Sequence, residues 1–440
     1  MTTVNQYRVW CTDLLQYEYA WGTTAPTVCP SDGGPIDTNL TTIVRSVSCN
    51  DVSVDNLPRT AFGELSIASL TPSIQAYFTY GVNMQLMSTS VTGSGSIIET
   101  DGMGTVSTGA AVSSSARIHS IKPVKYRAGQ GTLVRYTAVF TAGVAGNTQM
   151  VGAFDSDNGL GFGYNGTDFG IFRRSGGSTV WTNQTAWNID KLDGTGPSGL
   201  NIDFSQGFGN VFELKYQYLG FGTLAFDVEN PGTGMFLTVH KIQYPNTATV
   251  PVFRNSSFPL AIETINTTNN TDIAIKSGSM LAGTEGEVMY TGPGFNSSWN
   301  NIAVANGTET FIAAFKVKTT FGGINNKAIV YATLLSLATG STDKSQIIRL
   351  RKGATFTAPV WTDVNASQSS VQRLTGGTWD TGTGQVLSQQ NISGNGVPTN
   401  LQFDPSPASL YGVAGDNLVI TLQGLGAGSS WGSLSWIEDQ

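Results

Sequence analysis

Short runs in which apolar and polar residues alternate are the feature that most constrains how this sequence can fold. Within residues 211–218, Phe212, Leu214 and Tyr216 fall on one side of an extended chain, and charged or amide residues fall on the other. This alternation is that of a half-buried β-strand, whereas the apolar positions of a helix repeat about every 3.6 residues. The run therefore predicts a strand.

Turn-forming residues separate this run from others of the same kind. Gly-Phe-Gly at 220–222 precedes an alternating run at 224–229, and Asn-Pro-Gly-Thr-Gly at 230–234 precedes a run that starts at Met235. Gly, Asn and Pro favour turns because their backbones or side chains suit turn conformations. The three runs predict an antiparallel meander. Further alternating runs lie at 134–140, 311–317 and 418–422.

The pair Asn165-Gly166 lies between two aromatic, alternating segments that end at Tyr164 and resume at Phe169. Asn-Gly is a strong signal for a two-residue hairpin, because both central positions of a type I′ turn need positive φ. We therefore predict a hairpin with Asn165 and Gly166 at its turn.

The composition agrees with an all-β protein. Only 12% of the 440 residues are charged, about half the usual share of ~25%. The strong helix formers Glu, Lys and Arg are therefore sparse, and β-branched Thr is common. The aromatic share of 10% argues against disorder, and the formal net charge of −7 offers no basic field for phosphates. We expect a folded protein that does not bind nucleic acid.

The length suggests two to four domains, at roughly 100 to 200 residues each. We predict a mixed N-terminal region at residues 1–101, a central jelly-roll-like β-sandwich at residues 102–291 and a C-terminal β-sandwich at residues 299–440. The glycines and proline at 292–294 begin a segment, ending at Ser298, that is typical of a linker.

The N-terminal residues lack the basic and apolar regions of a signal peptide, and no run of about 18 apolar residues occurs. We therefore expect no membrane insertion. Three cysteines, Cys11, Cys29 and Cys49, have spacings that match neither a zinc site nor a disulfide scaffold. We expect reduced thiols, with a bridge between Cys11 and Cys29 as the minor alternative.

Few residues suggest chemistry. The two histidines, His119 and His240, accompany no nucleophile motif, so we predict no catalytic residue and no cofactor. Asp155 and Asp157 are closely spaced oxygen donors ahead of Gly159, an incomplete calcium-loop pattern that lacks the later Glu. The alternative for this segment is a β-turn rich in Asp and Asn. No other metal site is predicted.

Two tryptophans, Trp361 and Trp379, lie beside Thr, Asp and Gly and are our candidate ligand-binding residues. An exposed aromatic ring can stack on the apolar face of a sugar while neighbouring polar groups bond its hydroxyls. The alternative is that both rings belong to a core. Cleavage of a glycan would need two suitably spaced carboxylates, such as Asp203 and Asp227, and the sequence does not reveal their spacing.

An ordered series of short motifs runs through about two thirds of the chain. The motifs are Tyr-Arg-Val-Trp-Cys-Thr at 7–12, Trp-Gly-Thr-Thr-Ala-Pro-Thr-Val-Cys-Pro at 21–30, Val-Asp-Asn-Leu-Pro at 54–58, Leu-Thr-Pro at 70–72, Lys-Tyr-Arg-Ala-Gly-Gln-Gly at 125–131, Gly-Phe-Gly-Tyr-Asn-Gly at 161–166, Asp-Gly-Thr-Gly-Pro-Ser-Gly at 193–199 and Tyr-Leu-Gly-Phe-Gly at 218–222. Together they resemble a family of virion structural proteins from double-stranded DNA viruses of aquatic microbes, both tailed phages and giant viruses. The likeness fades after about Tyr290.

The resemblance implies a non-enzymatic structural protein of the virus particle, assembled in the host cytoplasm and then exposed on the virion. We expect a fibre, tail or surface appendage that contributes to host attachment, with residues 1–101 anchoring it to other virion proteins. Self-association, as a homotrimer, would cover the sheet edges. One alternative is an attachment protein that binds or depolymerises a host-surface carbohydrate. A second alternative is a capsid shell or decoration subunit.

Overall fold

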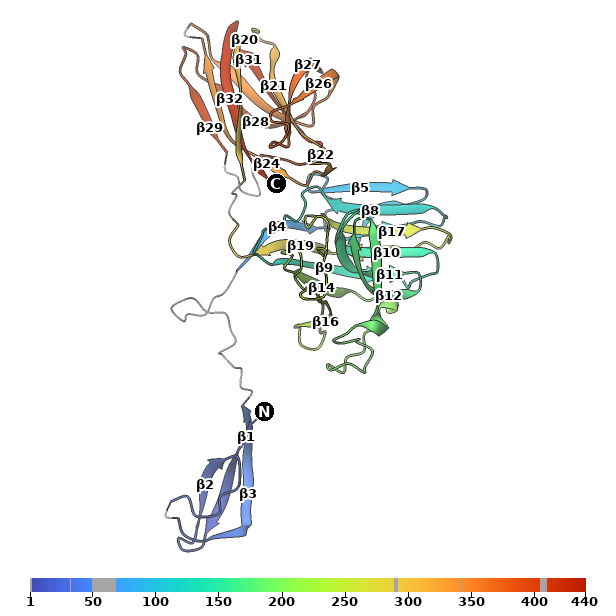
Figure 1. The fold of residues 1–440 in the computed structure, drawn as a ribbon, viewed down its shortest axis with the longest axis vertical. Helices are drawn as coiled ribbons and strands as arrows, with labels where there is room; N and C mark the ends of the chain where they lie inside the picture. The colour runs from blue at the N-terminus through green and yellow to red at the C-terminus, as the bar shows by residue number, and fades with distance from the viewer. Residues whose placement is uncertain (1, 32, 50–68, 289–291, 341, 404–409) are drawn as a thin grey trace. The chain divides into compact units, whose positions relative to one another are not determined.

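The computed structural model describes residues 2–31, 33–49, 69–288, 292–340, 342–403 and 410–440 (Figure 1). The chain divides into two compact units, residues 1–68 and 69–440. Among the described residues almost all regular structure is β-strand, and adjacent strands within each sheet run antiparallel. The prediction of an all-β protein with at least two antiparallel sandwiches is therefore confirmed.

The first unit is a three-stranded sheet. Its strand order is β2-β1-β3, from β2 (Gln16–Gly22), β1 (Thr2–Cys11) and β3 (Ile36–Cys49). A disulfide joins Cys11 to Cys29, so the expectation of reduced thiols is wrong for this pair and the minor alternative holds. Such a small sheet buries few apolar side chains, and small domains commonly need a covalent crosslink. The Cys49 thiol lies outside the described part of the structure.

Two sheets face each other in the central sandwich, the larger part of the second unit. The first sheet has the order β13-β12-β11-β10-β17-β8-β5. Its strands are β5 (Met87–Thr92), β8 (Ser114–Ser120), β10 (Asn147–Phe154), β11 (Gly159–Asn165), β12 (Asp168–Ser175), β13 (Ser178–Asn183) and β17 (Leu260–Asn266).

The second sheet has the order β16-β15-β14-β9-β18-β7-β6, and β19 joins it by pairing with both β9 and β4. The meander predicted from the alternating runs is present as β14, β15 and β16. The strands are β4 (Leu70–Tyr77), β6 (Ser96–Thr100), β7 (Met103–Ser107), β9 (Thr132–Phe140), β14 (Asn210–Tyr216), β15 (Leu224–Glu229), β16 (Phe236–Ile242), β18 (Ala274–Ser277) and β19 (Ser279–Glu285).

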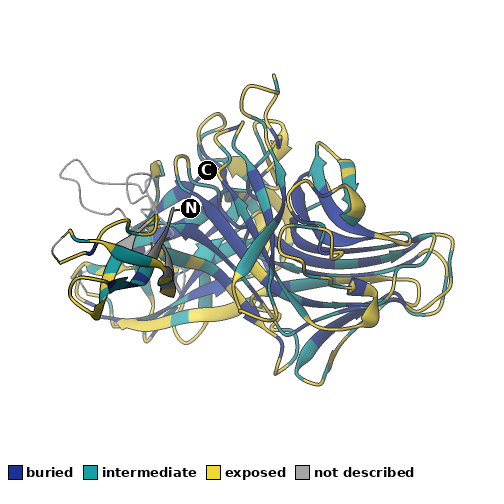
Figure 2. Ribbon diagram, turned by 90° about the horizontal axis from the view of Figure 1, so that it is seen from below, coloured by how far each residue is buried: buried dark blue, intermediate teal, exposed yellow. Residues whose placement is uncertain are grey.

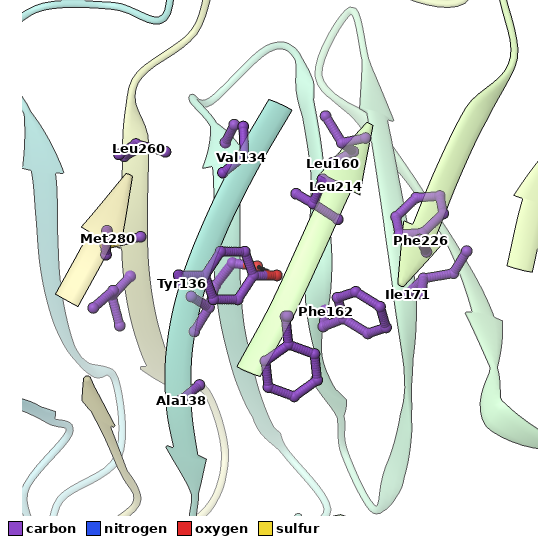
Figure 3. Close-up of a cluster of buried hydrophobic side chains, with 14 of the residues drawn as sticks. Val134, Tyr136, Ala138, Leu160, Phe162, Ile171, Leu214, Phe226, Leu260 and Met280 are labelled. Atoms are coloured by element: carbon purple, nitrogen blue, oxygen red, sulfur yellow. Dashed lines mark hydrogen bonds between the residues drawn. The ribbon is translucent and has the colours of Figure 1, made fainter. Parts of the chain in front are cut away.

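The core of the central sandwich lies between these sheets and is rich in aromatic rings. Alternate side chains of β9 and β14 point inward toward those of β11, as in Tyr136, Leu214 and Phe162 (Figure 3). The Tyr136 hydroxyl donates a hydrogen bond to the Val151 carbonyl, 3.0 Å away. Figure 2 shows buried residues along the strands and exposed residues concentrated in the loops at their ends.

The central sandwich begins earlier than predicted. Strands β4, β5 and β6 pair with β19, β8 and β7 of the sandwich, so the boundary predicted after residue 101 is replaced by one after residue 68. The strands from residue 87 to residue 107 are built largely from Ser, Thr and Gly, whose small polar side chains give little apolar alternation.

The C-terminal sandwich has a six-stranded and a five-stranded sheet. The six-stranded sheet has the order β26-β27-β21-β31-β25-β28, from β21 (Glu309–Val317), β25 (Gln346–Lys352), β26 (Phe356–Asp363), β27 (Val371–Trp379), β28 (Gln385–Ile392) and β31 (Asn417–Gly424). The five-stranded sheet has the order β20-β32-β24-β29, with β30 also on β24, from β20 (Gly294–Val304), β24 (Ile329–Thr339), β29 (Thr399–Gln402), β30 (Tyr411–Gly412) and β32 (Gly428–Asp439). A short ribbon joins β22 (Thr320–Phe321) to β23 (Ile324–Asn325).

Most of the predicted linker at 292–298 is strand rather than linker. Strand β20 starts at Gly294 and pairs with β32, so the C-terminal sandwich begins before the predicted residue 299. β20 is an edge strand of its sheet. An edge strand can carry many polar side chains, which explains why its sequence resembles a loop. In the described part of the chain, no helix is long and apolar enough to cross a membrane.

Candidate functional site

A cavity of about 310 Å³ opens among the loops of the central sandwich. We call it the Tyr164 pocket. It is lined by the loop after β9, the β11–β12 hairpin, the 3-10 helix η2 (Gln184–Ala186) that follows β13, and the 3-10 helix η3 (Phe204–Gln206). The lining residues are Ala142, Gly143, Tyr164, Thr167, Asp168, Phe169, Asn183, Gln184, Thr185, Asp203, Phe204 and Ser205.

The floor of the pocket is aromatic and continues the core of the sandwich. Tyr164 and Phe169 are a cross-strand pair at the end of the hairpin, and their ring centroids are 5.0 Å apart. Phe169 stacks on Phe204 at 4.1 Å, and Phe204 in turn lies 5.8 Å from the ring of Phe212 in the core. Because these rings are buried against one another, the floor is held in one arrangement.

The hairpin that carries the floor is present, but its turn differs from the prediction by one residue. Asn165 pairs with Asp168, so the two central turn positions are Gly166 and Thr167. Of these two, only Gly166 has positive φ, at 65°. That combination matches a type II′ turn, with glycine first, rather than the predicted type I′ turn. The shift places the Tyr164 and Phe169 side chains opposite each other.

Gly143 allows the neighbouring loop to approach this floor. A Cβ atom on Gly143 would clash with the Gly166 carbonyl oxygen and with the ring of Tyr164. Only a residue without a side chain fits there unless the floor moves.

Asp203 supplies fixed negative charge at the rim. Its Oδ1 accepts hydrogen bonds from the Ser205 backbone N–H at 2.9 Å and from the Ser205 hydroxyl at 2.6 Å. Its Oδ2 accepts one from Gln206 Nε2 at 2.7 Å. These bonds, first of all that from the Ser205 hydroxyl, hold the pKa of Asp203 below its ordinary value, so the carboxylate is ionised at neutral pH.

The pKa of Tyr164 depends on burial and in part on the negative charge of Asp203. Burial, and then the negative charge of Asp203, raise the pKa of Tyr164 to about 12, so its hydroxyl stays protonated. The residue is only 3% exposed, yet its hydroxyl makes no hydrogen bond to any described residue. A hydroxyl in a pocket wall without a protein partner is available to a ligand.

Two amides at the rim leave their carbonyl oxygens available. Asn183 Nδ2 donates to Asp168 Oδ2 at 3.0 Å, and Gln184 Nε2 donates to the Lys191 carbonyl at 2.8 Å. Neither the Asn183 and Gln184 side-chain oxygens nor Asp168 Oδ1 accept a hydrogen bond from a described residue. The rim therefore presents three free acceptor oxygens.

The sequence-predicted ligand residues lie elsewhere, together in the C-terminal sandwich. Trp379 is 5% exposed and packs in a small apolar cluster that Trp361 also contacts. Trp361 is half-buried, with the ring of Phe356 at 5.4 Å and Lys316 Nζ at 5.8 Å from its ring centroid. Trp379 is thus a core residue, which is the alternative to an exposed sugar-binding ring. Ligand binding by Trp361 stays a prediction.

The calcium candidates Asp155 and Asp157 line a different, polar cavity of about 320 Å³. Asp155 Oδ1 accepts from the backbone N–H groups of Asp157 and Asn158, the geometry of a turn built on an aspartate. Its Oδ2 forms an ion pair with Lys327 Nζ at 2.6 Å, and Asp157 Oδ2 accepts from Asn325 Nδ2 at 2.9 Å. Among the described residues, no group of three or more His, Cys, Asp or Glu could hold a metal ion. Calcium binding here stays a prediction.

Sequence reasoning missed the Tyr164 pocket as a site. It recognised the hairpin, but Asn183 and Asp203 reach the pocket from segments far along the chain. No motif links residues at those spacings. The available signal was the change from apolar residues in β11 and β12 to polar residues at their shared end.

No protein-family model matches the sequence, and no curated protein is significantly similar to it. Among solved structures, a point mutant of the carbohydrate recognition domain of Emp46p is 10% identical with a TM-score of 0.33, covering 50% of this chain and 100% of that one. The VIP36 exoplasmic/lumenal domain bound to Ca²⁺ and Man3GlcNAc is 12% identical with a TM-score of 0.31, covering 50% and 92%. A glycosyl hydrolase family protein from Mycobacterium fortuitum is 6% identical with a TM-score of 0.33, covering 50% and 100%. Likeness at these TM-scores says nothing about what this chain binds.

Proposed function

We propose that this protein is a non-enzymatic carbohydrate-binding attachment protein and that the Tyr164 pocket holds one sugar of its ligand. The observation that carries the proposal is the combination of an aromatic floor, a Tyr164 hydroxyl without a partner among the described residues and a rim of free acceptors in one cavity of about 310 Å³. A sugar presents apolar C–H groups to aromatic rings and hydroxyl groups to polar side chains.

Binding is favoured over cleavage by the state of the carboxyl groups. The general acid of a glycosidase needs a raised pKa so that it holds a proton at neutral pH. In the part of the chain that the structure describes, the carboxyl groups whose pKa departs from the ordinary value all shift downward, Asp203 included. The Tyr164 pocket is therefore better suited to hold a glycan than to protonate a leaving group.

The setting that we propose is the surface of a virus particle, as a fibre, tail or surface component that self-associates as a trimer. The support is the sequence resemblance, whose motif at 161–166 falls on β11 and the turn of the pocket hairpin. A capsid shell or decoration subunit is the alternative within the same setting. Light scattering of the purified chain, with negative-stain images, tests this: an elongated trimer supports an appendage, and a compact monomer argues against it.

Glycan binding is tested by filling the pocket. Thr185 is exposed and lines the pocket, whereas Thr308 is exposed in a loop of the C-terminal sandwich. The ligands are glycans that bind the unaltered chain on a glycan array. We expect Thr185→Trp to weaken their binding by tenfold or more, because the indole would occupy the ligand's space. Thr308→Trp should leave the dissociation constant unchanged. The measurement is isothermal titration calorimetry, with thermal unfolding to show that both variants are folded. Equal affinities in the two variants, or no saturable glycan binding by the unaltered chain, would contradict the proposal.

A further inference from the structure

The Tyr164 pocket carries negative charge that no nearby side chain compensates. Asp168 and Asp203 line it, and its lining residues include no Lys, Arg or His. Among the described residues, neither carboxylate forms a salt bridge. A ligand that enters the pocket therefore meets a negative potential.

The rim of the pocket carries free acceptor oxygens. Asn183 Nδ2 and Gln184 Nε2 each donate one hydrogen bond, to Asp168 and to the Lys191 carbonyl, and each amide keeps its oxygen as a free acceptor. Asp168 Oδ1 is a third free acceptor. The complementary ligand group is one that donates several hydrogen bonds and accepts none, and an ammonium group does this with three N–H donors.

A second observation, independent of the acidic residues, indicates that a ligand belongs here. Tyr164 is only 3% exposed, lines the cavity and keeps a hydroxyl without a partner among the described residues. This hydroxyl can donate to a sugar ring oxygen or accept from a sugar hydroxyl. The pocket thus combines a sugar-binding floor with an acceptor-rich, anionic rim.

From this arrangement we infer that the Tyr164 pocket selects glycans that carry a free amino group, and that it disfavours acidic glycans such as uronic acid, sulfated or sialic acid chains. The inference rests on the proposed carbohydrate-binding function and names the ligand class for that site. An ammonium group beside Asp168 gains a charge-assisted hydrogen bond, while a carboxylate or sulfate there is repelled by like charge. An acetylated amine loses its charge and keeps a single N–H donor.

The test compares four oligosaccharides of equal length and β-1,4 linkage: oligomers of glucosamine, N-acetylglucosamine, glucose and glucuronic acid. Calorimetric titration of the full chain in mildly acidic buffer, where the amine is protonated, gives their dissociation constants. We expect the glucosamine oligomer to bind about two- to fivefold more tightly than the neutral oligomers, as for one partly exposed charge pair. The glucuronic acid oligomer should bind most weakly. Added salt should reduce the preference, because it screens exposed charges.

Asp168→Asn removes the charge while keeping the side chain's shape, and it should abolish most of the preference for the amine without abolishing binding of the neutral oligomers. Asp101→Asn is the matched control, because Asp101 is exposed in another loop and does not line the pocket. Preference lost in the first variant and kept in the second supports the inference. Equal binding of amine and neutral oligomers, or tighter binding of the acidic one, overturns it while leaving the proposed function in place. Failure of all four to bind overturns this inference, and an array on which no glycan binds the chain overturns the proposed function as well.

Discussion

The central and C-terminal sandwiches follow the same strand pattern but stabilise their interiors differently. The central core is a connected set of aromatic rings, with Phe212 in contact with Tyr136, Phe140 and Phe162. The C-terminal core is mainly aliphatic, with two tryptophans, and it also contains the fully buried carboxylate of Glu438.

Three of the buried carboxylates, Glu213, Asp227 and Glu438, illustrate two kinds of partner. In the central sandwich, Glu213 and Asp227 are neutralised by the cations Arg135 and Lys215. Glu438 instead accepts hydrogen bonds from neutral donors of Ser369, Ser370, Trp436 and Gln440, and the described residues include no cation in an ion pair with it. The negative charge of Glu438 is therefore stabilised by hydrogen bonds from neutral groups rather than by an ion pair.

The aromatic core of the central sandwich explains how the Tyr164 pocket can have a preformed floor. A network of rings can extend from the core to the end of a hairpin without exposing an unpaired polar group, and Phe169 and Phe204 do so beneath the Tyr164 pocket. A buried carboxylate network must be closed on all sides, because each unpaired member would destabilise the fold. In the central sandwich the aromatic core thus supplies the floor of the Tyr164 pocket.

The largest effect is expected for Phe212→Ala, which removes the ring at the centre of the aromatic network. Phe212 is fully buried, so the loss of contacts and the remaining cavity should lower the free energy of unfolding by about 3–5 kcal/mol. Phe208→Ala, at a side chain that is 70% exposed, should change it by less than about 0.5 kcal/mol. Calorimetric unfolding of the full chain measures both. A small loss for Phe212→Ala would show that the rings do not act as one core.

Much of the central core could be predicted from sequence because alternation reports which side of a strand is buried. Phe212, Leu214 and Tyr216 are buried as their pattern indicates. The pattern gives no signal where the side chains are small, so the prediction places strands β5 and β6 in the N-terminal region rather than in the central sandwich. The alternation also gives no information about loops, because loop conformation depends on hydrogen bonds such as those of Ser205 to Asp203. The sequence therefore could not place Asp168 and Asp203 at one pocket.

The next largest effect is expected for Glu438→Gln in the C-terminal sandwich. The substitution places an N–H donor among the donors of Ser369, Ser370 and Trp436 and removes the charge that they stabilise. We expect the free energy of unfolding at neutral pH to fall by about 2–3 kcal/mol, the range for hydrogen bonds to a charged group. Glu287→Gln, at an exposed residue, is the control.

The pH dependence sharpens this test. Burial acts to raise the pKa of Glu438, but its hydrogen bonds, that from Ser369 foremost, outweigh burial and hold the pKa below 4.5, the ordinary value. Its contribution to stability is therefore complete above that value and is lost as the pH falls through the lower pKa of the folded state. The difference between the unaltered chain and Glu438→Gln should shrink in acid. A difference that stays constant with pH would show that the charge of Glu438 is not what its donors stabilise.

The smallest effect on stability, but a direct one on the pocket, is expected for Gly143→Ala. The added methyl group would meet the Gly166 carbonyl and the Tyr164 ring, and such overpacking lowers the free energy of unfolding by about 1–3 kcal/mol. Because one of the groups that the methyl would displace is the Tyr164 ring of the pocket floor, glycan affinity should fall more than the change in stability suggests. Gly209→Ala is the control, since its Cβ would meet only Val139 Cγ2, at 3.6 Å. If Gly143→Ala destabilises the fold but leaves glycan affinity unchanged, the Tyr164 ring is not part of the binding surface. The contrast between the cores of the two sandwiches would then concern stability alone.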